Sequence, residues 1–371
     1  MKTILVTGSE GFVGRNLVAH LQPDENVRLL RFDTHNTEQE LATYLEQADF
    51  VFHLAGVNRP EHESEFKTGN ADLTGRIVEI LQTVGKKTPI VLSSSTQATL
   101  DNPYGRSKKQ AEDHVFAYSQ QTGASTYVYR LPGLFGKWSR PNYNAVVSTF
   151  CYNISHELPI QINNPDHLLT LAYIDDVISE FRANLDGEAH WDQDGFCYVP
   201  KTFQITLQVL ADLICSFPAS RDTAALPDMN DPLTKRLYST YLSYLGTDDF
   251  SYFADMKTDD RGWLFELVKS PHMGQIFVSQ TKPGITRGEH YHHTKAEKFV
   301  VVQGRAVIRF RKIDADEIIE YPVSGEKIEI VDIPPGYTHD ITNVGDTDVI
   351  TLFWANEIFD PENPDTTYLK V

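Results

Sequence analysis

Three histidines and a glutamate lie close together in the stretch GITRGEHYHHTKAEKFVVVQG, which begins at residue 284. His290 and His292 are separated by one residue, so on a strand both side chains point to the same face, whereas the third histidine points to the other face. Glu297 follows in the same stretch, and His339 lies further along in PPGYTHDITN. Three imidazoles and one carboxylate make a donor set that borderline metals such as zinc accept. We therefore predict a metal site, with Zn²⁺ as its expected ion, formed by His290, His292, Glu297 and His339.

A second group of reactive side chains lies near the middle of the first half, in SSSTQATLDNPYGRSK. Tyr104 and Lys108 are four residues apart, so on a helix they share a face. A phenol with a pKa of roughly 10 needs help to exchange protons near neutral pH, and a neighbouring ammonium provides it by stabilising the phenolate. A hydroxyl from the preceding strand would hold a substrate carbonyl. We expect Ser95 in that role, with Ser94 as the alternative.

A third signal is the spacing G-x-x-G-x-x-G near the beginning of the chain, formed by Gly8, Gly11 and Gly14. The glycines follow the apolar run TILVTG and precede an amphipathic helical pattern. The first two let a turn bring backbone N–H groups against a diphosphate, and Gly14 lets the new helix pack closely on the strand. The position between strand and helix predicts a dinucleotide site.

The elements that position these groups can be read from hydrophobic periodicity. The first half alternates short apolar runs, as in VRLLRF, DFVFHLAG and PIVLSSS, with helical patterns such as QELATYLEQ and TGRIVEILQTV. This alternation predicts an α/β doubly wound parallel sheet. Ligands in such sheets bind outside the carboxyl ends of the strands, which brings Gly56, residues 93–96 and the glycine turn to one crevice.

The pattern changes near residue 246. Segments such as GQIFVSQTK, KFVVVQGRAVIRFRK and DVITLFWANEIF have strand composition, and turn signals separate them at short intervals. This favours an all-β sandwich or small barrel. We predict a nucleotide-binding domain over 1–245 and an all-β domain over 246–371.

Composition limits the partners. The chain of 371 residues has a formal net charge of −18, which disfavours binding to nucleic acid or to anionic membranes. Its three cysteines form no C-x-x-C pair, which favours a reducing, cytoplasmic environment. No stretch approaches the roughly 18 apolar residues that a membrane-spanning helix needs.

The ordered motifs TGSEGFVG, HLAG, SSS and YGRSK resemble those of the extended short-chain dehydrogenases/reductases, over about residues 1–245. The resemblance implies a Rossmann fold, an NAD(P) cofactor, a nucleotide-linked sugar as substrate, and Tyr104, Lys108 and Ser95 as catalytic residues. One departure is Gly133, where the family often has Asn. The implied cofactor contacts are Gly8, Gly11, Phe12, Val13, Gly14, Arg31, His35, Leu54, Ala55, Gly56, Tyr104 and Lys108.

The choice between the two nicotinamide cofactors is left open by the residues. Asp33, near the end of the second strand, suits a ribose 2′-hydroxyl and therefore NADH, whereas Arg31 and His35 suit the 2′-phosphate of NADPH. Biosynthetic reductases commonly use NADPH, so NADPH is our expectation and NADH is not excluded.

The second half carries the spacing G-x₅-H-x-H-x₄-E-x₆-G and then P-x-G-x₂-H-x₃-N, which resembles the signature of the cupins, a family of jelly-roll barrels. The phrases DDRGWLFE, TRGEHYH and EKFVVVQG also resemble the dTDP-4-keto-6-deoxyhexose epimerases. That second resemblance implies that His290 is a general base and that Lys298 steadies an enolate. One histidine is thus a candidate for two roles, and Tyr337, Lys298 and Asp332 are candidates for the acid that reprotonates the sugar.

Longer phrases, including HLAGVNRPEH, LFGKW, LYSTYLSYL and HHTKAEKF, resemble the CapF-type bifunctional enzymes of UDP-N-acetyl-L-fucosamine synthesis. This resemblance spans the whole chain. It implies a UDP-2-acetamido-2,6-dideoxy-4-hexulose as substrate, C3 epimerisation by the cupin domain, and NADPH-dependent C4 reduction to UDP-N-acetyl-6-deoxy-L-talosamine for capsule or O-antigen sugars. A homodimer is expected, because cupin sheets often pair across a two-fold axis. The alternatives are a monofunctional reductase with a structural, dimerising cupin, and a nucleotide-sugar sensor.

Overall fold

The computed structural model describes all residues from 1 to 371, and the chain divides into two compact units. The first unit comprises Met1–Cys215 and Arg236–Gly246, and the second comprises Ser216–Lys235 and Thr247–Val371. The sequence predicts a boundary between residues 245 and 246, whereas the structure divides the chain after Gly246 and assigns Ser216–Lys235 to the second unit. This segment joins the second unit through a parallel bridge, in which Lys269 N donates to Ala224 O and Leu226 N donates to Lys269 O.

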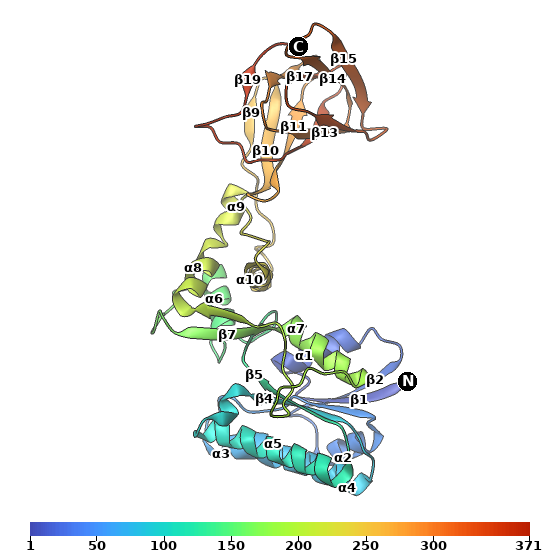
Figure 1. Cartoon of the computed structure of the whole chain (residues 1–371), viewed down its shortest axis with the longest axis vertical. Helices are drawn as coiled ribbons and strands as arrows, with labels where there is room; N and C mark the ends of the chain where they lie inside the picture. Colours follow the sequence, from blue (N-terminus) through green and yellow to red (C-terminus); the bar gives the residue numbers. More distant parts are fainter. The chain divides into compact units, whose positions relative to one another are not determined.

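The first unit is built on a five-stranded parallel sheet in the order β2-β1-β3-β4-β5. Helices α1 and α7 pack on one face of this sheet, and α2, α4 and α5 pack on the other (Figure 1). Both faces are therefore buried, which explains the uninterrupted apolar runs of the strands. The bounds are β1 Lys2–Thr7, α1 Phe12–Leu21, β2 Val27–Phe32, α2 Glu38–Gln47, β3 Phe50–His53, α4 Leu73–Val84, β4 Ile90–Ser95, α5 Pro103–Thr122, β5 Thr126–Leu131 and α7 Ile174–Ala183.

The strand order reverses between β1 and β3, which is the point where doubly wound sheets bind ligands. The glycine turn follows β1 at this point. Gly8 has φ +65°, and a Cβ there would lie 2.6 Å from Ala55 N, while a Cβ on Gly14 would lie 2.0 Å from Gly8 O. Only glycine fits either position, so the predicted close packing of turn, helix and strand is confirmed.

Smaller elements complete the first unit. A three-stranded sheet has the order β6-β7-β8. The segment before α4 contains a π-helix, η1, at Lys67–Asp72. The remaining bounds are α3 Ser64–Phe66, β6 Gly133–Phe135, α6 Val146–Ser155, β7 Leu168–Tyr173, β8 Phe203–Thr206, α8 Leu207–Ser216 and α10 Pro232–Leu242, with short 3₁₀ turns at Thr96–Thr99 and Asn184–Asp186.

The second unit consists of two antiparallel sheets, ordered β16-β13-β18-β11-β10-β9 and β15-β14-β17-β12-β19, with an apolar core that draws side chains from both. This arrangement confirms the predicted cupin-like all-β fold (Figure 1). The bounds are α9 Ala219–Thr223, β9 Lys257–Asp259, β10 Gly262–Ser270, β11 Gly274–Thr281, β12 Thr286–Tyr291, β13 Glu297–Gln303, β14 Arg305–Lys312, β15 Ile318–Ser324, β16 Ile330–Ile333, β17 Tyr337–Asn343, β18 Val349–Ala355 and β19 Thr367–Tyr368.

The three cysteines are free thiols. Cys151 and Cys197 are buried, whereas Cys215 is exposed. Among the helices, none combines the length and the apolar composition needed to cross a bilayer.

Candidate active sites

Ser95, Tyr104 and Lys108 form what we call the Tyr–Lys site, at the end of β4 and the beginning of α5. Helix α5 begins where the Asn102 side chain accepts a hydrogen bond from Gly105 N at 2.7 Å, with proline at the first helical position. This cap sets the first turn, and with it the position of Tyr104. Burial raises the pKa of Tyr104, and a hydrogen bond with Ser95 opposes that rise. The structure therefore brings the predicted hydroxyl and phenol together.

Ser94, the alternative to Ser95, is turned away from the Tyr–Lys site, because successive residues on a strand point to opposite faces. Its hydroxyl donates to Glu112 Oε1 at 2.6 Å. Arg130 completes this buried group with two hydrogen bonds to the Glu112 carboxylate, at 2.9 and 2.7 Å, and its guanidinium lies 3.7 Å from the Phe196 ring centroid. Ser94 thus belongs to a buried ion-pair group, and Ser95 is left to face a substrate.

Lys108 is 5% exposed, and its ammonium donates to Ser93 O at 3.0 Å. Burial lowers the pKa of Lys108 to about 8, while the nearby Glu112 carboxylate acts in the opposite direction. The helical spacing of Tyr104 and Lys108 predicts that the ammonium lowers the pKa of Tyr104. In the ligand-free site, burial dominates instead, and the pKa of Tyr104 is raised.

Asn70 is a residue of this region that the sequence argument missed. Its Oδ1 accepts from Val57 N at 2.9 Å, and its Nδ2 donates to Ser107 Oγ at 3.0 Å. Ser107 in turn donates to Tyr104 O at 2.8 Å. Asn70 therefore ties the loop after β3 to the first turn of α5. It lies in the π-helix η1, a feature that is frequent at functional sites and has no readable sequence signature.

A cavity of about 630 Å³ adjoins the glycine turn, and Arg15, Arg31 and His35 line it. The Arg15 guanidinium lies 5.3 Å from the Trp138 ring centroid. The Asp33 carboxylate is already engaged, because it accepts from Glu10 N at 2.7 Å and from Thr34 N. Arg15 was missed in the sequence, although its place directly after Gly14 would have suggested it.

In the second unit, His290, His292, Glu297 and His339 converge, and we call them the metal cluster. Their potential ligand atoms all lie within 4.8 Å of one another. The Nε2 atoms of His292 and His339 are buried without any hydrogen-bond partner. Buried polar atoms are rarely left unpaired, so two orphaned nitrogens next to a carboxylate fit a cation between them. The donor set is the one that zinc accepts.

A bulge aims His290 into the metal cluster. Between Gly288 and His290 the register of β12 against β17 shifts, and Gly288 and Glu289 have φ values of 101° and 62°. A Cβ on Gly288 would lie 2.8 Å from His339 O, so glycine is required there. His290 pairs directly with His339 as a result. His290 and His292 share a face by simple alternation, as expected, and the bulge determines that His290 on this face pairs with His339.

The protonation states suit metal binding. Burial, with repulsion from the neighbouring histidines, lowers the pKa of His290 to about 4, which leaves a neutral imidazole. Burial of Glu297 acts to raise its pKa, but the neighbouring His292 and His339, each 3.4 Å from its carboxylate, outweigh burial and lower it overall. His290 and Glu297 are therefore unprotonated, as metal binding requires.

Lys298 lies outside the metal cluster, contrary to the expectation that it would steady an enolate beside His290. Glu297 and Lys298 are adjacent on β13, so the glutamate points inward and the lysine points outward. Lys298 is bound to Asp332 on the outer face of the sheet, which removes Asp332 from the cluster as well. Tyr337 is different, because it alternates with His339 on β17 and packs against the inner core.

Comparison with known proteins finds relatives of both units. The NAD dependent epimerase/dehydratase family matches residues 4–189, and the polysaccharide biosynthesis C-terminal domain matches residues 257–367. A UDP-2-acetamido-2,6-beta-L-arabino-hexul-4-ose reductase from Pseudomonas aeruginosa is 46% identical over 98% of this chain and 97% of its own length. The capsular polysaccharide assembling protein CapF from Staphylococcus aureus has a structure with a TM-score of 0.92 at 49% identity, covering 99% of this chain and 100% of CapF. The chain belongs to the CapF family.

The CapF likeness includes both units and therefore both candidate sites. A further CapF structure, solved with the inhibitor 3-isopropenyl-tropolone, has a TM-score of 0.88 at 44% identity and covers all of both chains. A UDP-glucuronic acid 4-epimerase from Bacillus cereus covers 65% of this chain and 98% of its own, with a TM-score of 0.54 at 16% identity. At that identity the likeness shows the fold alone.

Proposed function

We propose that the chain catalyses two successive reactions on a UDP-linked 4-keto amino sugar, a UDP-2-acetamido-2,6-dideoxy-4-hexulose. The second unit epimerises C3, and the first unit then reduces C4 with NADPH to give UDP-N-acetyl-6-deoxy-L-talosamine for capsule or O-antigen synthesis. The observation that supports this proposal is that one chain brings together two groups of candidate residues, the Tyr–Lys site and the metal cluster. The name of the Pseudomonas relative, a reductase of a UDP-linked 4-ketosugar, supports the substrate class.

The order of the two reactions follows from the chemistry of the substrate. A ketone at C4 acidifies the neighbouring C3–H bond, so that C3 can lose a proton and be reprotonated from the other side. Reduction at C4 removes the ketone and ends this acidity. Epimerisation must therefore precede reduction.

In the reduction, the residues of the Tyr–Lys site transfer a proton to the C4 carbonyl oxygen. Bound NADPH would supply the hydride that is transferred to C4. The Ser95 hydroxyl holds the carbonyl oxygen, and Tyr104 donates a proton to it as negative charge develops. The Lys108 ammonium stabilises the phenolate that remains, and its fixed hydrogen bond to Ser93 O keeps it on the strand side of the helix.

In the epimerisation, the metal cluster is the proposed binding place of the C4 ketone. A zinc ion held by His290, His292, Glu297 and His339 would polarise a carbonyl as a Lewis acid. We assign His290 to the metal, because a ligand imidazole is not free to act as a base. Tyr337 becomes the preferred candidate for proton transfer, since Lys298 and Asp332 lie on the opposite face of their sheet.

Deuterium exchange tests the proposal directly. With the intact enzyme in D₂O and no NADPH, we expect C3 of the ketosugar to incorporate deuterium, as followed by proton NMR. Addition of NADPH should then convert the exchanged ketone to the alcohol. Reduction without prior C3 exchange would instead favour a monofunctional reductase with a structural cupin.

The cavity beside the glycine turn leads us to propose NADPH rather than NADH. Arg15 and Arg31 line this cavity, and Asp33, the residue that would select NADH, is bound to the backbone. We expect Arg31→Ala to raise the KM for NADPH by about 10- to 100-fold with little change in kcat, because it removes one charged hydrogen bond to the 2′-phosphate. Arg28→Ala removes the same charge from β2 outside the cavity and is the control. An equal rise in KM for NADH would count against a 2′-phosphate role for Arg31.

The outer face of the six-stranded sheet supports the proposed homodimer. By strand register it carries the apolar side chains of Trp263, Phe265, Ile276, Val278, Val300, Ile330, Ile350, Leu352 and Trp354. Ile330 is 63% exposed, and Val300 and Leu352 are half-buried. This face also carries the Lys298–Asp332 ion pair, but its many apolar side chains are typical of a surface that a second copy covers.

A charge placed in the middle of this face should separate the subunits. We expect Leu352→Lys to convert a dimer to a monomer in light scattering coupled to size exclusion, because a buried unpaired ammonium strongly disfavours association. Ile318→Lys, on the exposed edge strand β15, is the matched control and should leave the mass unchanged. A Leu352→Lys protein that stays dimeric would show that the dimer interface lies on another surface.

A further inference from the structure

The loop that connects β12 to β13 links three of the four residues of the metal cluster. His290 and His292 precede this loop, and Glu297 follows it. The connection comprises residues 292–296, and we call its last four residues, 293–296, the loop. A second segment, residues 356–366, which we call the C-terminal strap, lies against the loop and holds it at both ends.

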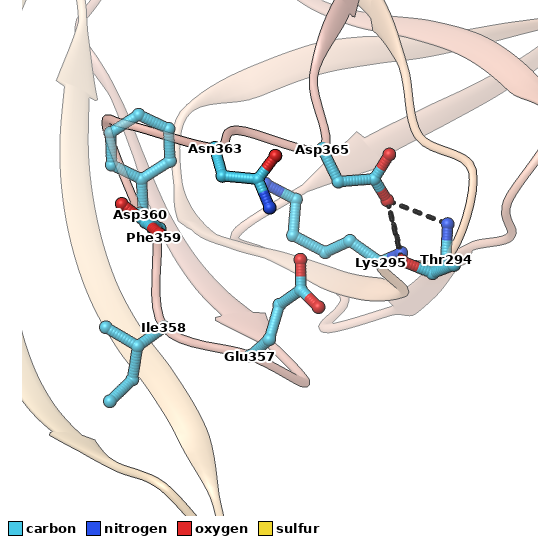
Figure 2. A pocket seen from close by; sticks show the side chains of 8 residues that line it. All are labelled: Thr294, Lys295, Glu357, Ile358, Phe359, Asp360, Asn363 and Asp365. Atoms are coloured by element: carbon cyan, nitrogen blue, oxygen red, sulfur yellow. Dashed lines mark hydrogen bonds between the residues drawn. The ribbon is translucent and has the colours of Figure 1, made fainter.

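Asp365 of the strap binds the backbone of the loop. Its carboxylate accepts hydrogen bonds from the N–H groups of His293 at 2.9 Å, Thr294 at 2.7 Å and Lys295 at 2.8 Å. Figure 2 shows the carboxylate facing the loop, with two of these hydrogen bonds drawn. The Thr294 hydroxyl donates a further hydrogen bond to Oδ2 at 3.0 Å, the oxygen that also accepts from the Thr294 and Lys295 N–H groups. Oδ1 accepts from the His293 N–H group, so both carboxylate oxygens are acceptors.

The backbone of Asp365 contacts a metal-cluster residue directly. Its carbonyl oxygen accepts a hydrogen bond from Nδ1 of His292. A proton held on Nδ1 leaves the lone pair of Nε2 free, and Nε2 is the orphaned atom that faces the cluster. The strap therefore fixes both the ring orientation and the tautomer of this histidine.

The other end of the strap is anchored to the same loop. Asn356 and Ala296 exchange two hydrogen bonds of 3.1 Å, one of them through the Asn356 side chain. Between the anchors, a cavity of about 250 Å³ contains the Lys295 side chain, whose ammonium lies 5.9 Å from the Phe359 ring centroid (Figure 2). Phe359 N also donates to Gln275 Oε1 at 3.1 Å, so the strap has several anchors, and Asp365 is the one that contacts His292.

We propose that Asp365 is a positioning residue of the metal site, which holds the loop 293–296 and keeps His292 in the orientation and tautomer that binds the ion. The inference rests on the metal site of the proposed function. It extends that site to a segment far away in the sequence, and it makes metal affinity depend on the docking of the C-terminal strap. Partners that orient a ligand histidine are typically worth 10- to 100-fold in metal affinity.

Zinc affinity of the full-length protein tests this role, measured by competition with a chromogenic chelator. We expect Asp365→Ala to weaken Zn²⁺ binding by about 10- to 100-fold. Asp365→Asn should weaken it less but in the same direction, because either orientation of the amide places its NH₂ against a backbone N–H donor. Asp360→Asn is the control, since Asp360 lines the same cavity and caps the strap rather than the loop.

A second readout separates positioning from a general loss of structure. In the zinc-free protein, nitrogen-resolved NMR of the His292 ring should show protonation at Nδ1 in the native chain and a mixture of tautomers in Asp365→Ala. Native zinc affinity in both Asp365 variants, or an unchanged His292 tautomer, overturns the proposal. If the native chain itself does not bind Zn²⁺, both this proposal and the metal site fail, whereas C3 exchange in D₂O still tests the epimerisation separately.

Discussion

Tyr104→Phe is expected to stop C4 reduction and to leave C3 exchange intact. The variant keeps the ring in its buried position and removes the only group that we assign to donate a proton to the carbonyl oxygen. General acid catalysis of this kind typically contributes a factor of about 10² to 10⁴, so oxidation of NADPH should fall by at least that range. Proton NMR in D₂O should at the same time show an accumulated ketone that is epimerised and deuterated at C3.

Two serines provide a matched comparison for this result. Ser95→Ala should lower kcat markedly, by about 10²-fold, because it removes the hydroxyl that holds the developing oxyanion. Ser94→Ala should leave kcat nearly unchanged, since Ser94 donates to Glu112 on the other face of β4. An unchanged rate of NADPH oxidation in Tyr104→Phe would contradict the assignment of the Tyr–Lys site as the reductase site.

Most of the fold of the first unit could be predicted from local signals in the sequence. The glycine turn could be predicted because a side chain at Gly8 or Gly14 would clash with neighbouring backbone, as the close approach of Gly8 to Ala55 shows. The meeting of β1, β3 and β4 at one crevice followed from the alternation of strands and helices, which fixes the carboxyl ends of the strands at one edge. The pairing of Tyr104 with Lys108 needed only helical spacing.

Lys298 shows a different kind of error. Simple alternation along β13 already separates it from Glu297, so the residues themselves argued against a shared site. Resemblance to an epimerase family placed it there instead. The same alternation distinguishes Ser94 from Ser95, and there the sequence argument chose the residue that the structure places beside Tyr104. The alternation of side chains along a strand therefore tests whether a role inferred from a related family fits a given residue.

The features that sequence reasoning missed depend on contacts between distant segments. Residues 216–235 belong to the second unit because of a bridge to Lys269. The loop 293–296 beside the metal cluster is held by Asp365. The bulge at Gly288 and the π-helix that contains Asn70 are irregularities of register. No periodic pattern reports such features, because each is fixed by packing in the finished fold.

His339→Gln is expected to remove zinc from the second unit and to abolish C3 exchange. His339 is fully buried, its Nε2 has no hydrogen-bond partner, and it contacts Glu297 at 3.4 Å. Losing one of four protein ligands should weaken zinc binding by at least about 100-fold, since even indirect partners are worth 10- to 100-fold. Metal content measured after dialysis, together with deuterium incorporation at C3, gives the two readouts.

The paired outcomes decide what the metal does. His293→Gln is the control, because His293 is exposed next to the cluster and should keep both zinc and exchange. The Tyr–Lys site should remain able to reduce a ketone that has already been epimerised, since it lies in the other unit. A zinc-free His339→Gln protein that still exchanges C3 at the native rate would assign the metal a structural role. In that case its removal should appear mainly as a lower unfolding temperature of the second unit, because binding energy at a structural zinc site is folding energy.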